Sequence, residues 1–151
     1  MSGPGPIPAT PVAGERDPCR LLRLVLLLAA AHSAAVGVGL IGLPGRWLPA
    51  LGLAGEGGLF FRWQGGVFHL LMAYAYLLAA RRLPRARLLV HLAVTVKVAA
   101  TLFLVLYCLL VDTAWVVAAS AAGDGLLAGL LVAGSRRAAP CWREPAGGPP
   151  R

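Results

Sequence analysis

The feature that most constrains this chain is a series of long apolar runs that cover most of its 151 residues. A helix needs about 20 mostly apolar residues to cross roughly 30 Å of bilayer hydrocarbon. Four segments meet this requirement, at about 21–42, 59–80, 88–111 and 113–134. Only 13% of the residues are charged, whereas a soluble domain has about a quarter. We therefore predict an all-α membrane protein, because transmembrane β-strands would alternate apolar and polar residues.

The arginines are concentrated on one side of the four predicted spans. They precede the first span, fill the connection between the second and third, and follow the fourth: Arg16, Arg20, Arg23, Arg81, Arg82, Arg85, Arg87, Arg136, Arg137, Arg143 and Arg151. The other two connections carry only Arg46 and Arg62. Short cytoplasmic loops are enriched in Lys and Arg. We therefore predict an antiparallel bundle of four transmembrane helices, multi-pass in the cell membrane, with both termini cytoplasmic. This placement accounts for the net charge of +8 without a nucleic acid partner.

The two ends of the chain differ from the spans in composition. Residues 1–18 are rich in Pro and Gly, and the last residues read PCWREPAGGPPR. Such segments cannot bury enough apolar surface to fold. We predict disordered cytoplasmic tails over 1–18 and 136–151, on either side of a transmembrane domain at 19–135.

The sequence contains no motif for a metal, a cofactor or a catalytic group. It has no CxxC, no Cys/His pair at metal-ligand spacing, no HExxH or GxSxG and no nucleotide-binding loop. In the predicted topology Cys19 and Cys141 face the reducing cytoplasm, and Cys108 lies in the third span. We therefore expect no disulfide framework, no metal and no cofactor, and we assign no catalytic residue.

Each span carries one ionisable residue near the predicted bilayer centre: His32, His69, Lys97 and Asp124. Lys97 lies ten residues beyond Arg87, and Asp124 lies twelve residues before Arg136. Since a helix rises about 1.5 Å per residue, these positions have nearly equal depth. An isolated charge at the bilayer centre costs at least about 2.5–3.5 kcal/mol. We predict that Lys97 and Asp124, on adjacent helices, form an ion pair.

The second and fourth spans add further features. Arg62, His69 and Tyr76 are spaced by seven residues and share one face. Gly65, Gly66 and Ala73 share that face and allow close approach of a neighbouring helix. Gly125 and Gly129 form a GxxxG motif, which is typical of close packing between membrane helices.

Candidates for ligand binding or proton relay are Asp124, Lys97, His69, His32 and Arg62. Each has a structural alternative. The Lys97–Asp124 pair would only fix helix packing, and a lone His would be a hydrogen-bonded core residue. Arg62 would extend its side chain to the outer interface.

The stretches FFRWQGGVFHLLMAYAYLLAARR and VTVKVAATLFLV, in the second and third spans, resemble the small bacterial DoxX-like membrane proteins. The resemblance implies four helices, with an Arg near the head of a span followed by Gly and a polar residue in a later span. That family is linked to membrane redox complexes, but this chain has no cysteine pair that would support redox chemistry. It also differs in its long connection after the first span and in the GDG sequence at 123–125.

Three functions agree with a polar site among four apolar helices. The first is a non-enzymatic protein of the lipid bilayer that binds a lipid-like or quinone-like molecule, or joins a larger membrane complex. The second is a proton- or cation-coupled transporter, a homo-oligomer because four helices leave little room for a water-filled path. In it Asp124 would exchange a proton. The third is an intramembrane isomerase that uses Asp124 and a histidine as acid and base.

Overall fold

The computed structural model describes residues 19–53, 58–111 and 114–142, and these residues are mainly helical, without a strand. The elements are α1 (Arg20–Gly42), η1 (Gly45–Trp47), η2 (Pro49–Leu51), α2 (Leu59–Arg81), η3 (Leu83–Arg85), α3 (Arg87–Leu110), α4 (Trp115–Arg137) and η4 (Ala139–Trp142). The all-α prediction is confirmed. The predicted tail over 1–18, and the end of the other from 143 onward, lie outside the described residues. The predicted start of the second tail at 136 is wrong, because α4 continues to Arg137 and η4 follows it.

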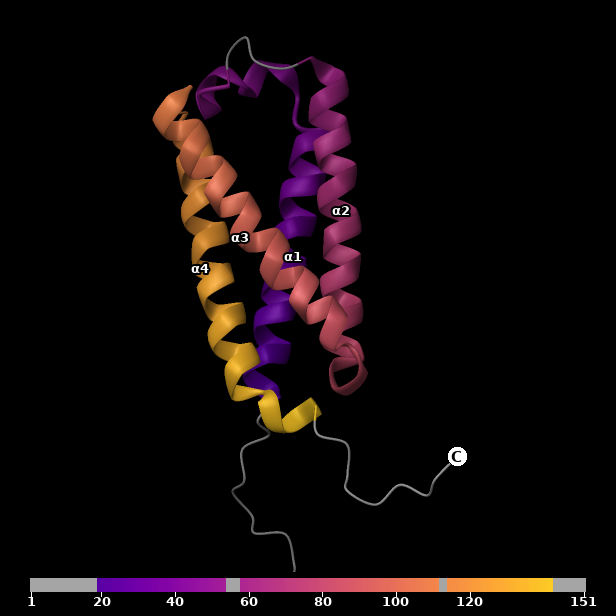
Figure 1. The fold of residues 1–151 in the computed structure, drawn as a ribbon. Helices are drawn as coiled ribbons and strands as arrows, with labels where there is room; N and C mark the ends of the chain where they lie inside the picture. The colour runs from indigo at the N-terminus through magenta and orange to yellow at the C-terminus, as the bar shows by residue number, and fades with distance from the viewer. Residues whose placement is uncertain (1–18, 54–57, 112–113, 143–151) are drawn as a thin grey trace, which may run out of the picture.

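Two helical hairpins make up the described structure. α1 packs along most of its length on α2, and α3 packs on α4, whereas α1 and α4, like α2 and α3, share fewer contacts. Consecutive helices run in opposite directions (Figure 1). At the end where α1 finishes and α2 begins, here called the upper end, the two hairpins lie apart. The short helices η1 and η2 cross there from one hairpin towards the other.

Many large apolar side chains of the long helices face outward, whereas two charged residues, Lys97 and Asp124, are buried between the helices. α1, α3 and α4 are each long and apolar enough to cross a membrane. α2 is equally long, but Arg62, Gln64 and His69 lower its mean hydropathy. Large apolar side chains face outward, for example Leu88, which is 85% exposed, and Leu110, which is 78% exposed. This distribution is the reverse of that in a soluble protein, and it indicates a membrane protein.

The most densely packed core lies at the lower end, where the hairpins converge. Its fully buried side chains include Leu22, Leu26, Leu83, Val90 and Leu131. The indole Nε1 of Trp142 in η4 donates to the carbonyl oxygen of Leu83 at 3.3 Å and ties the end of α4 to the turn between α2 and α3. This contact helps hold the two hairpins together at the lower end.

Glycine brings α1 and α2 into backbone contact. A Cβ added at Gly37 would lie 2.8 Å from the carbonyl oxygen of Gly66, and one at Gly66 would lie 2.5 Å from Cγ1 of Ile41. The expected close approach is confirmed at Gly66, whereas a Cβ at Gly65 would lie 3.6 Å from Cδ1 of Leu40, an ordinary contact. The GxxxG prediction holds for one glycine only: a Cβ at Gly125 would lie 3.3 Å from Cγ2 of Thr101, whereas one at Gly129 would meet nothing within 4 Å.

The prediction that no cysteine forms a disulfide is wrong for Cys19, which is disulfide-bonded. Cys108 is free. The prediction considered only the redox state of the compartment, and this argument does not say which side chains the fold brings together. Disulfides persist in oxidising compartments.

Candidate functional site

The predicted ion pair is present inside the second hairpin. Nζ of Lys97 on α3 donates to Oδ1 of Asp124 on α4 at 2.5 Å, and the two residues are only 2% and 3% exposed. Their charges offset each other in apolar surroundings, which keeps either one from being buried alone. Thr101 Oγ1 donates to the carbonyl oxygen of Lys97, at 2.7 Å. Gly125 lets α4 approach Thr101 closely, so the hairpin is tight at this level.

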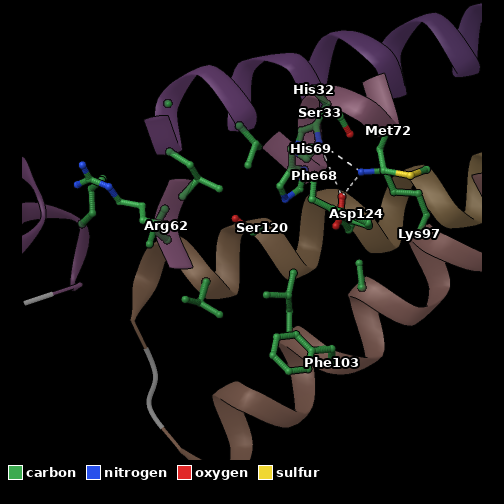
Figure 2. A pocket seen from close by; sticks show the side chains of 18 of the residues that line it. His32, Ser33, Arg62, Phe68, His69, Met72, Lys97, Phe103, Ser120 and Asp124 are labelled. Carbon is green, nitrogen blue, oxygen red and sulfur yellow. Dashed lines mark hydrogen bonds and ion pairs between the residues drawn. The ribbon is translucent and has the colours of Figure 1, made fainter. Parts of the chain in front are cut away.

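The first hairpin contributes two further side chains to this cluster. Nδ1 of His32 on α1 lies 3.5 Å from Nζ of Lys97 and 3.7 Å from Oδ1 of Asp124. Nζ of Lys97 also lies 5.7 Å from the ring centroid of Tyr76 on α2, a cation–π distance. All four long helices therefore meet around Lys97 (Figure 2). The expected match in depth is confirmed for His32, Lys97 and Asp124.

A cavity of about 550 Å³ adjoins the cluster of His32, Lys97, Tyr76 and Asp124. It is lined by all four long helices and by the connection between α1 and α2, from which Leu48, Leu51 and Leu53 contribute. It lies above the packed core, where the hairpins separate. Its walls are mostly apolar. Small-molecule sites in proteins typically measure about 300–1,000 Å³ and combine apolar walls with a few polar groups, and this cavity fits that description.

The other two predicted residues, His69 and Arg62, also line the cavity. His69 on α2 packs edge-on against Phe68, with ring centroids 6.2 Å apart. Arg62, near the start of α2, lies at the opposite end of the cavity from Lys97 and Asp124 (Figure 2). The structure thus brings three candidates into contact and places the other two along the same cavity.

Two buried polar atoms on the cavity lining have no hydrogen-bond partner among the described residues. They are Oγ of Ser33 on α1 and Nε of Arg62. A buried polar group left unpaired costs about 1–3 kcal/mol, so these atoms mark places where a bound molecule would supply the missing bond. Sequence reasoning missed Ser33. Its only signal is a hydroxyl next to His32 within the small apolar residues of α1.

Two phenylalanines of the cavity lining also reach the outer surface. Phe68 on α2 and Phe103 on α3 both line the cavity, yet they are 53% and 66% exposed. α2 and α3 share few contacts. These two side chains therefore face both the cavity and the outer surface.

Known proteins give no guide to the role of the site. The chain matches no protein-family model, no curated protein and no solved structure. Among the described residues there is also no group of three or more His, Cys, Asp or Glu side chains that could hold a metal ion. The function is therefore argued from the cavity and its polar groups.

Proposed function

We propose that the chain is a four-span protein of the cell membrane that binds a small apolar molecule bearing a polar group. In this proposal α1 to α4 form an antiparallel transmembrane bundle with both termini cytoplasmic. The alternating arginine content of the connections supports the orientation. The length of α2, which matches that of α1, supports a fourth span. The likeness to DoxX-like proteins agrees with four helices, and we infer no activity from it.

The observation that supports binding is the apolar cavity of about 550 Å³ with a polar cluster at one end. A Lys ammonium has three donors, and Asp124 accepts one of them. A carbonyl or hydroxyl oxygen of a lipid-like or quinone-like molecule would accept another. The unpaired hydroxyl of Ser33 adds a further hydrogen-bonding group on the same lining.

Native mass spectrometry of the full chain, purified in mild detergent, tests this proposal. We expect a bound small molecule on the unaltered protein. Ala100 lines the cavity, so Ala100→Trp should fill it and remove the bound mass. Leu102 on the same helix is 59% exposed, and Leu102→Trp should leave the bound mass in place. A bound mass that survives Ala100→Trp, or a protein without any bound molecule, would overturn the proposal.

A second candidate, proton- or cation-coupled transport by a homo-oligomer, draws on a different observation. Side-chain nitrogen and oxygen atoms of His32, Lys97 and Asp124 lie within 3.7 Å of one another, and each side chain can carry a proton. The test is flux into liposomes driven by a pH gradient. Transport requires flux that Asp124→Asn abolishes, and liposomes that stay tight to protons with the unaltered protein would exclude it. The same cluster is the only support for acid–base isomerisation, which ranks third.

A further inference from the structure

We propose that the ligand of this cavity is an anionic amphiphile with a single acyl chain. Its carboxylate or phosphate would bind the guanidinium of Arg62, and its chain would extend along the apolar walls towards the Lys97–Asp124 pair. This inference rests on the proposed binding function and specifies the class of ligand.

The charges on the cavity lining are unequal. Among the residues that line it, Lys97 and Arg62 are cationic and Asp124 is anionic. Lys97 and Asp124 are joined at 2.5 Å and neutralise each other. With His32 and His69 neutral, the cavity retains one positive charge, that of Arg62. A neutral ligand such as a quinone would leave this charge without an anionic partner among the described lining residues, whereas a monoanion would balance it.

The position of Arg62 suits a headgroup contact. It is the fourth residue of α2 and lies at the upper end of the cavity, beyond the apolar walls that separate it from the ion pair (Figure 2). Its Nε is buried and has no hydrogen-bond partner in the described part of the chain. A guanidinium presents its donors as a planar fork that matches carboxylate and phosphate oxygens in pairs. Leu48 and Leu51 line the cavity from the connection and would cover the first carbons of the chain.

The test compares a negatively charged probe with an uncharged ester of the same molecule. cis-Parinaric acid, a fluorescent single-chain carboxylic acid, and its methyl ester are titrated into the full chain in mild detergent. We expect the acid to bind about 10- to 100-fold more tightly than the ester, the range of a charge-assisted hydrogen bond. Arg62→Gln should remove this preference and leave ester binding unchanged, and Arg62→Lys should restore part of it. The exposed Arg46 supplies the control, since Arg46→Gln should bind both probes as the unaltered protein does.

The possible results separate this inference from the function on which it rests. If both probes bind and Ala100→Trp abolishes binding, the cavity is a ligand site. Equal affinity for acid and ester, or a preference that persists in Arg62→Gln, would then overturn the anionic class alone. If neither probe binds, both proposals fail. Displacement of the probe by oleate or by oleoyl lysophosphatidic acid shows whether Arg62 accepts the carboxylate or the phosphate more tightly.

Discussion

Lys97 is the residue on which the polar interior depends. It is 2% exposed and contacts Asp124, His32 and Tyr76, which come from the other three long helices. An ammonium group at this depth is tolerated because Asp124 supplies an opposite charge. Removing either partner leaves the other charge buried and uncompensated, which is costlier than removing both.

We therefore predict strong coupling between these two residues. Lys97→Met and Asp124→Asn should each lower the free energy of unfolding by about 3 kcal/mol, and the double variant should regain part of that loss. The measurement is unfolding in detergent followed by circular dichroism. Leu126→Ala, at a side chain that is 66% exposed, serves as a control with little effect. Additive losses in the double variant would show that the pair contributes no coupling.

The contacts of Lys97 illustrate what can be predicted at the scale of residues. Counting residues from the arginines at the span ends gives depth, because the helical rise is constant. Depth, together with opposite charge on adjacent helices, was sufficient to pair Lys97 with Asp124. It gave His32 and His69 the same level and did not show that His32 contacts the pair. It does not give the rotation of one helix against another. The contact with Tyr76 and the burial of Ser33 depend on that rotation and could not be derived from spacing.

At the scale of elements, the tightest contact is between α1 and α2, and it depends on two glycines. A methyl group at Gly37 would meet the backbone oxygen of Gly66 at 2.8 Å, a distance that real Cβ atoms do not adopt. A backbone atom cannot move aside as a side chain can. The helices would have to separate, which would disturb every contact along the first hairpin.

We predict that Gly37→Ala destabilises the protein by about 1–3 kcal/mol, the range for overpacked interiors. Gly129→Ala is the matched control, because its Cβ would meet nothing within 4 Å. Alanine favours a helix over glycine by up to about 1 kcal/mol, so Gly129→Ala should be neutral or stabilising. Thermal unfolding in detergent measures both. Equal behaviour of the two variants would contradict a backbone contact at Gly37.

These glycines also show why helix packing was only partly predictable. The GxxxG spacing at Gly125 and Gly129 is the better-known motif, yet only Gly125 lies at a helix contact. Gly37 lies two residues before Gly39, and this spacing does not single out one face of a helix. Whether a glycine is needed depends on how closely the partner helix lies, and the position of the partner helix is known only from the fold.

At the scale of the whole molecule, the cavity follows from the way two hairpins meet. Large side chains such as Leu22, Leu83 and Leu131 fill the lower end, while the hairpins lie apart at the upper end (Figure 1). A void is a small difference between the volume that the helices enclose and the volume that their side chains fill. Composition and spacing do not give that difference. The polar candidates could therefore be predicted, and the cavity that connects them could not.

The number of spans and their orientation lead to the last prediction. Three helices pass by length and composition as membrane spans, and α2 is the fourth in our proposal. An even number of spans puts both chain ends on one side of the membrane, and three spans would put them on opposite sides. We predict that green fluorescent protein fused at either end of the full chain is fluorescent, and that alkaline phosphatase fused at either end is inactive.

The outcomes of these fusions separate the span count from the orientation. A control phosphatase fusion truncated after Gly52 retains α1 alone and should be active, because it carries the enzyme to the outer side. Phosphatase activity at one end of the full chain but not at the other would show that one helix does not cross the membrane. That helix would be α2, which is the least apolar of the four. Activity at both ends would agree with four spans and would show that both chain ends lie on the outer side of the membrane. That result would agree with a disulfide at Cys19 and would mean that the arginines do not set the orientation.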